Sequence, residues 1–111
     1  IKISSLSKNE DFKSLTKGKK ISNKYFTTFF KKLPDKSNKK LNISFVAQKK
    51  IGSAVKRNKI KRRLRNMMAD AIKKINLNFN YSYLLIAKKN IFEDRYANIK
   101  KILFEDFKGI K

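Results

Sequence analysis

The sequence predicts an α+β fold in which helices pack against a four-stranded sheet. The first observation is length, because 111 residues suffice for one modest core and not for two. The second is composition, since an apolar fraction of 41% with nine Phe and four Tyr favours a packed domain over disorder. The third is hydrophobic spacing, which predicts elements in the order α-β-β-β-α-β-α. We expect a single domain over residues 1–111, with its core at about 6–108.

A short helix is predicted first. Ser7 or Asn9 can cap it, Phe12 and Leu15 lie one turn apart on its apolar side, and Gly18 can end it. The capping side chain accepts a hydrogen bond from a free backbone N–H of the first turn, and glycine tolerates the backbone geometry that ends a helix.

Strands are predicted next. The segment from Ile21 to Lys32 is rich in aromatic and β-branched residues, which favour strands. A turn or loop at 34–38 follows it, with proline, aspartate, serine and asparagine. Apolar residues then alternate with polar or smaller ones, which is the period of a strand, at Leu41, Ile43, Phe45 and Ala47.

A long helix is predicted from about Ser53 to Ile75. Its apolar residues recur at three- and four-residue steps and make one stripe: Ile60, Leu64, Met67, Met68, Ala71, Ile72 and Ile75. The run from Tyr81 to Ala87 suits a buried strand. Glu93 and Asp94 are expected to open a last helix, which Gly109 ends. Its stripe is predicted at Tyr96, Ile99, Ile102 or Leu103, and Phe107.

Charge points to a polyanionic partner. The chain has 30 basic and 8 acidic residues, for a net charge of +22. Such a charge opposes compaction unless a polyanion neutralises it, and contact with phosphates would release counterions and make binding depend on salt. The arginines are informative, because four of the five fall between Arg57 and Arg65. The planar fork of arginine suits phosphate geometry in a way that lysine cannot reproduce.

Several function classes are excluded or disfavoured. The chain has no Cys and no His, so it lacks disulfides, thiolate or imidazole zinc ligands, and a histidine base. Six carboxylates come as neighbours in sequence (10–11, 93–94 and 105–106), and adjacent helical residues point about 100° apart, so we expect neither a catalytic centre nor a metal site in the protein. No apolar run approaches the roughly 20 residues of a membrane span, and none opens the chain as a signal peptide. We therefore expect a soluble cytoplasmic protein without a membrane partner.

The segment from Lys56 to Arg65 carries the functional signal, because seven of its ten residues are basic. On a helical wheel, Ile60 and Leu64 point inward and polar side chains occupy both flanks. One flank carries Asn58, Lys61, Arg62 and Arg65, and the other carries Lys59 and Arg63. A solvated helix face is the simple alternative, but seven like charges repel one another unless something neutralises them.

The longer stretch from Lys49 to Arg65 resembles the signature of the bacterial ribonuclease P protein family. The matching residues are Lys49, Lys50, Ile51, Gly52, Ala54, Val55, Arg57, Asn58, Lys61, Arg62 and Arg65. Weaker matches flank this specific one at Leu6–Phe12 and Leu84–Lys88, so the resemblance spans about Leu6 to Lys108. Two positions depart from the pattern: Lys59 replaces a usual arginine, and Thr16 replaces a common aromatic.

The resemblance implies an α+β fold of the ribosomal protein S5 domain 2-like type, in which the basic helix joins two parallel strands by a left-handed crossover. It implies a subunit of an endoribonuclease whose catalytic RNA cleaves the 5′ leader from precursor tRNA, with Mg²⁺ acting through the RNA and one protein per RNA. The RNA-binding residues would be Lys49, Lys50, Lys56, Arg57, Asn58, Lys59, Lys61, Arg62 and Arg65. Phe12 and Phe29 would line a cleft for the single-stranded leader, although both also fit a role as core aromatics.

Other functions remain open at this point. A ribosomal or general structured-RNA-binding protein would also be small and basic, and would bind ribosomal RNA without affecting tRNA maturation. A DNA-binding protein is disfavoured because no helix-turn-helix pair or dimerisation seam is present in the pattern. A membrane-surface role would require the apolar stripe to be exposed, and an independent nuclease would lack catalytic groups.

Overall fold

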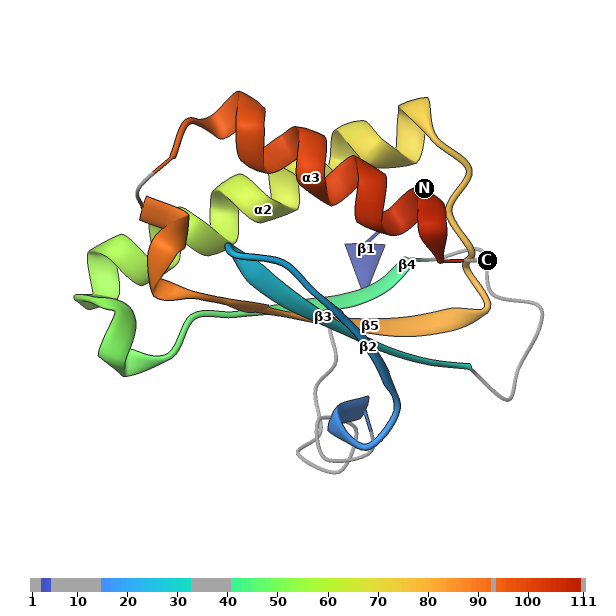
Figure 1. Ribbon diagram of the computed structural model, residues 1–111, viewed down its shortest axis with the longest axis horizontal. Helices are drawn as coiled ribbons and strands as arrows, with labels where there is room; N and C mark the ends of the chain where they lie inside the picture. The colour runs from blue at the N-terminus through green and yellow to red at the C-terminus, as the bar shows by residue number, and fades with distance from the viewer. Residues whose placement is uncertain (1–2, 5–14, 33–40, 93, 111) are drawn as a thin grey trace.

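The computed structural model describes residues 3–4, 15–32, 41–92 and 94–110, and Figure 1 shows the long helices lying above the sheet. The strands are β1 (Ile3–Ser4), β2 (Lys19–Ser22), β3 (Phe26–Lys32), β4 (Leu41–Val46) and β5 (Tyr81–Ala87). The helices are α2 (Ala54–Lys74) and α3 (Tyr96–Gly109), with short 3₁₀ helices η1 (Lys49–Ile51) and η2 (Lys89–Phe92). The predicted caps Ser7 and Asn9 of the first helix lie outside the described residues.

The sheet is mixed, with strand order β1-β4-β5-β3-β2. Strands β4 and β5 are parallel neighbours joined by α2, as the family resemblance implied, while β3 pairs antiparallel with both β5 and β2. The four longer strands account for the predicted sheet. A two-residue strand, β1, extends it at the edge by pairing parallel with β4.

The aromatic segment predicted as strand from Ile21 to Lys32 is a hairpin with a tight turn at Asn23. The Asn23 side-chain Oδ1 accepts hydrogen bonds from the backbone N–H groups of Tyr25 (2.7 Å) and Phe26 (3.0 Å). An asparagine that bonds to the backbone two residues on is a standard turn former. The turn therefore divides the segment into β2 and β3.

Gly18 ends the helical backbone at Leu15 and Thr16, as predicted, and has a second role. A Cβ at this position would lie 2.9 Å from the backbone oxygen of Phe30 in β3. That is closer than real Cβ atoms approach other atoms. Only glycine allows the start of β2 to run this close to β3 without a shift of backbone.

The core fills the space between the sheet and the two helices. Alternate strand residues face the helices, and the largest buried ones include Phe26, Ile43, Tyr83 and Leu85. From α2, the buried residues are Ile60, Leu64, Met67, Met68 and Ala71, and from α3 they are Ile99, Leu103 and Phe107. Leu15 and Leu84 are also buried but lie outside this cluster.

The helix α2 matches its predicted boundaries within one residue. Ser53 caps it, with its Oγ accepting a hydrogen bond from the backbone N–H of Lys56 at 3.3 Å, and Ile75 follows its last turn. The last helix was predicted less well. It begins at Tyr96, after Glu93 and Asp94, so the predicted acidic first turn is wrong.

The stripe of α3 also differs from the prediction at one end. Tyr96, which was predicted to be part of it, is 36% exposed. The reason is that Asp94 lies ahead of the helix and bonds Tyr25 and Asn98, which fixes the start of α3 one turn before its first buried residue, Ile99.

Candidate nucleic-acid interface

The solvent side of α2 carries a dense set of cations, because its apolar stripe faces the core. Five of the predicted RNA-binding residues are exposed there: Lys56, Asn58, Lys59, Arg62 and Arg65. Arg63, which was not among the predicted contacts, is exposed on the same helix. We call these six residues the basic face. The repulsion among its five cations is unfavourable for the isolated protein and would be relieved by phosphates.

The two remaining predicted residues of α2, Arg57 and Lys61, are half-buried on the flank of the stripe. The Nε of Arg57 is buried and, within the described part of the chain, has no hydrogen-bond partner. An unsatisfied buried donor costs about 1–3 kcal/mol, and more when it belongs to a charged group. An acceptor oxygen supplied by a ligand would satisfy it, so Arg57 is poised for a contact that the protein does not make itself.

Four lysines gather at one edge of the sheet, where the parallel strands β4 and β5 both end. Lys49 and Lys50 belong to η1 shortly after β4, and Lys88 and Lys89 follow β5 directly. A cavity of about 530 Å³ at this edge is lined by Lys50, Lys88, Lys89 and the strand residues Thr27 and Ile86, among others. We call Lys49, Lys50, Lys88 and Lys89 the edge cluster.

The edge cluster is partly fixed by hydrogen bonds from Lys88. Its Nζ donates to Ser22 Oγ (2.7 Å) and to the backbone oxygen of Asn23 (2.6 Å). Asn23 in turn donates from Nδ2 to Asp106 at 2.8 Å. The hairpin turn, the end of β5 and α3 are therefore tied together, which holds one cation of the cluster in place.

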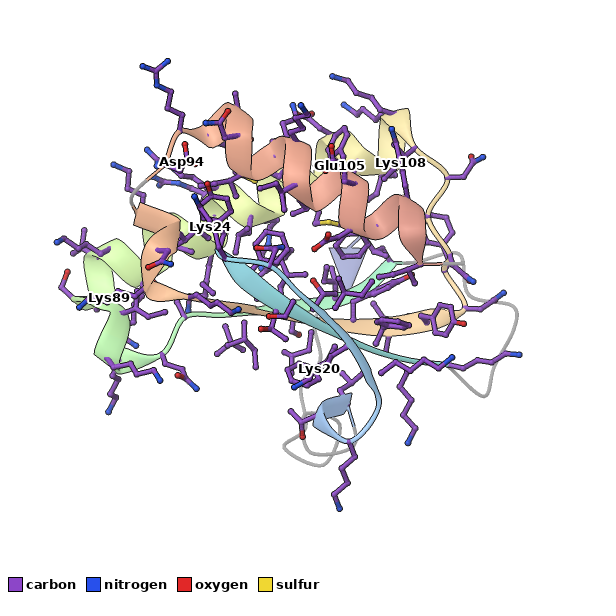
Figure 2. All side chains as sticks on the ribbon, viewed as in Figure 1. Lys20, Lys24, Lys89, Asp94, Glu105 and Lys108 are labelled. Carbon is purple, nitrogen blue, oxygen red and sulfur yellow. The ribbon has the colours of Figure 1, made fainter. Side chains whose placement is uncertain are left out.

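The face of the sheet turned away from α2 and α3 carries Phe29. Register pairs Phe29 with Lys20 of β2 and Leu84 of β5, so the three side chains share this far face. Figure 2 shows Lys20 on the side opposite the helices. Phe29 is half-buried beside the buried Leu84 and lies outside the main core cluster, whereas its neighbour Phe30 packs against that cluster.

The far face continues to the edge cluster. Thr27 and Ile86, which line the cavity beside Lys50, are register partners on the same face as Phe29. An aromatic ring, aliphatic side chains and flanking cations together suit a single-stranded nucleic acid. The other residue predicted for the leader cleft, Phe12, lies outside the described residues.

The predicted RNA-binding set left out four cations that lie in or beside these surfaces: Lys20, Arg63, Lys88 and Lys89. Lys88 and Lys89 had a usable sequence signal. A Lys-Lys pair follows each of the two strands predicted at 41–47 and 81–87, and parallel strands end at the same edge of a sheet. The sequence signal for Lys20 was weaker, because its pairing with Phe29 becomes apparent only when the hairpin register is known. Arg63 lay in the basic run itself and was left out because the family pattern does not mark it.

Three of the described carboxylates make structural contacts within the protein. Asp94 accepts hydrogen bonds from Tyr25 Oη, Asn98 Nδ2 and the backbone N–H of Arg95, and these hold its pKa at about 2. Asp70 accepts from Lys100 Nζ at 2.5 Å, which links α2 to α3 and lowers the Asp70 pKa. Partial burial raises the pKa of Asp106, which Asn23 partly offsets.

Two structural features are absent from the described residues. They contain no group of three or more His, Cys, Asp or Glu placed to hold a metal ion. Among these same residues, no helix is long and apolar enough to cross a membrane.

Known proteins resemble the chain over almost its whole length. The family model for ribonuclease P matches residues 2–110. The chain belongs to the ribonuclease P protein family. A ribonuclease P protein component of Fusobacterium nucleatum is 37% identical, with 98% of each chain covered. One from Mycoplasma capricolum is 32% identical over 96% of this chain and 94% of the relative.

Solved ribonuclease P proteins share the fold. The protein from Thermotoga maritima aligns with a TM-score of 0.80 over 97% of this chain and 98% of that one, at 24% identity. The protein from Staphylococcus aureus aligns with a TM-score of 0.74 at 26% identity, over 93% of this chain and 90% of that one. Membership of the ribonuclease P family makes the chain the protein component of an endoribonuclease that works with an RNA partner.

Proposed function

We propose that the chain binds the catalytic RNA of ribonuclease P through the basic face of α2 and the 5′ leader of precursor tRNA through the far face of the sheet. The observation that carries the proposal is the division of α2. Its stripe from Ile60 to Ala71 is buried, whereas the arginines and lysines of the basic face, between Lys56 and Arg65, are exposed to solvent. A helix anchored in this way presents its cations as a rigid array.

The array suits a folded RNA. Residues from Lys56 to Arg65 span roughly 14 Å at about 1.5 Å per residue, which corresponds to a few phosphates along a strand. Arg62 and Arg65 can each make bidentate contacts with phosphate, whereas Lys59 supplies a point charge. Arg57 would gain an acceptor for its buried Nε.

The leader would lie along the far face, past Phe29 and toward the edge cluster. Stacking on an aromatic ring is worth about 1–3 kcal/mol per base and tolerates any base. Lys20, Lys50 and Lys89 are exposed along this path and would contact the leader phosphates. A leader held in this way needs no defined sequence.

The chemistry would belong to the RNA subunit and its Mg²⁺ ions. The chain would supply substrate affinity and screening of phosphate repulsion, as one copy per RNA in the cytoplasm. Screening by protein cations partly replaces screening by Mg²⁺, so the requirement for Mg²⁺ should fall when the protein is present.

Reconstitution tests the proposal. The chain is combined with a bacterial ribonuclease P RNA at a Mg²⁺ concentration at which the RNA alone is inactive, and cleavage of a precursor tRNA is followed. We expect restored cleavage at the mature 5′ end. If the chain binds the RNA and restores nothing, it is a general or ribosomal RNA-binding protein instead.

A further inference from the structure

A narrow groove lies between α2 and the segment that carries η2 and α3. Ile60, Leu64 and Met67 of α2 form one wall, and Ile91 and Ile99 form the other. Its volume is about 270 Å³, just below the roughly 300–1,000 Å³ of pockets for drug-sized ligands. The groove therefore has room for a single ring system between aliphatic walls.

The rim of this groove is cationic. Lys56, Lys59 and Arg63 line it from α2, at steps of three and four residues along one side of the helix. Within the described ranges, Lys59 and Arg63 have no carboxylate partner. The nearest carboxylate along this flank of α2, Asp70, is already bound by Lys100 at 2.5 Å. An apolar slot with Lys59 and Arg63 at its mouth is complementary to a flat ring joined to a negatively charged group.

We propose that this groove takes up one unpaired nucleotide of the catalytic RNA, with its base between the aliphatic walls and its phosphate at Lys59 and Arg63. The inference rests on the proposed function, because the groove opens beside the basic face that would bind the RNA. Proteins hold unstacked bases between apolar side chains, and folded RNAs offer such bases in loops and bulges. The guanidinium of Arg63 can bind the phosphate through two parallel hydrogen bonds.

The side chains of the groove are not expected to discriminate among the four bases. Its five wall side chains are aliphatic or thioether groups, which offer no strong hydrogen-bonding group to a base edge. The contact should therefore favour an unpaired nucleotide over a paired one and show little preference among the four bases. It would fix the position of the protein on the RNA through the shape of the RNA rather than through its sequence.

The principal test fills the groove without changing charge. Ile91→Phe adds a ring to one wall, and Arg65→Gln, which removes a cation of the basic face outside the groove, is the comparison. Affinity for a bacterial ribonuclease P RNA is measured over a series of KCl concentrations, and reactivity of the RNA 2′-hydroxyls to an acylating reagent is mapped with and without protein.

Ile91→Phe should weaken binding about tenfold with an unchanged salt slope, because it removes a base contact and no phosphate contact. One unpaired nucleotide whose reactivity wild type alters should return to its free-RNA reactivity. Arg65→Gln should instead lower the salt slope by about one and leave that nucleotide altered. If Ile91→Phe binds and protects as wild type does, the groove takes no nucleotide.

A second variant keeps the test decisive if Ile91→Phe does not fold, which circular dichroism would reveal. The chain has no Cys, so Lys59→Cys gives one attachment point for a photoreactive azidophenacyl group. Crosslinks from position 59 should map to that same unpaired nucleotide, and those from Lys101→Cys on α3 should not. Crosslinks from position 59 to paired RNA alone would overturn the inference. Failure of wild type to bind the RNA would instead overturn the proposed function.

Discussion

The basic face of α2 and the far face of the sheet offer RNA two different kinds of surface. The helix presents six polar or charged side chains within three turns and has its apolar residues buried behind them. The far face presents one half-buried aromatic, Phe29, with lysines at its margins. The first surface suits closely spaced phosphates and the second suits unstacked bases. Each surface therefore fits a different part of a ribonuclease P complex.

If the proposed function holds, this difference would allow a single small domain to distinguish two RNA ligands. A folded catalytic RNA has closely spaced phosphates and few free bases, which suits a rigid cationic helix. A single-stranded leader has free bases, which suits stacking on a sheet. The two surfaces lie on different layers of the sandwich, so both can be occupied at once.

The largest expected effect is a loss of RNA affinity when arginines of α2 are replaced. Replacing Arg57, Arg62 and Arg65 together with Ala should weaken binding of the catalytic RNA about 100-fold or more, because three charge-assisted contacts are lost. The salt slope should fall by about three. The measurement is RNA affinity over a KCl series.

The control removes the same charge elsewhere, by replacing Arg95, Lys101 and Lys108, which are exposed outside α2. This variant should bind RNA nearly as wild type does at moderate salt. Equal losses for both triple variants would mean that net charge, rather than the basic face, binds the RNA.

A smaller effect is expected on the sheet side. Phe29→Ala should lower affinity for precursor tRNA roughly tenfold and leave affinity for leaderless tRNA unchanged, because only the leader stacks on this ring. The neighbouring Phe30→Ala is the matched control, since Phe30 packs against the core. It should lower the melting temperature without changing the ratio of the two affinities. A Phe29→Ala variant that loses both affinities equally would assign Phe29 to folding.

The smallest effect on RNA affinity is expected from the hydrogen bond between Tyr25 and Asp94, which joins the β2–β3 hairpin to the start of α3. Hydrogen bonds from Tyr25, Asn98 and Arg95 lower the Asp94 pKa from 3.8 to about 2. A lowered native pKa adds stability above the unfolded pKa, and this stability is lost as pH falls through the native value. The melting temperature of wild type should therefore decline between about pH 4 and pH 2 more than that of Asp94→Asn.

For this pH experiment, Glu105→Gln makes the same charge change at an exposed position on α3. It should keep the wild-type decline. An Asp94→Asn variant with the wild-type pH profile would show that Asp94 does not stabilise the fold. RNA affinity at neutral pH should change little in either variant, because both residues lie away from the basic face.

Local patterns were sufficient to predict the elements that carry their own signal. The helix α2 has a serine cap, a regular stripe and a basic exterior, and it was placed within one residue at each end. The strand β5 is apolar apart from Ser82, and it too was placed correctly. In both cases the residues that decide the structure are neighbours in sequence.

The remaining features depend on contacts between distant residues. Phe29 and Phe30 are adjacent and chemically identical, and only the pairing of β3 with β5 decides which of them faces the helices. The start of α3 is set by the bond from Tyr25 to Asp94, 69 residues apart. The edge cluster forms because β4 and β5 are parallel, which places two lysine pairs from separate segments at one edge.

The most direct test of two separate RNA surfaces compares the Arg57/Arg62/Arg65 variant with Phe29→Ala in one titration. Assembly with the catalytic RNA is measured first, and affinity for precursor and leaderless tRNA is then measured with protein at saturation. The two-surface account predicts that the arginine variant loses assembly and keeps its preference for the leader once saturated, whereas Phe29→Ala assembles normally and loses that preference. If both variants lose assembly and leader preference in the same proportion, the two surfaces do not act separately and the account is contradicted.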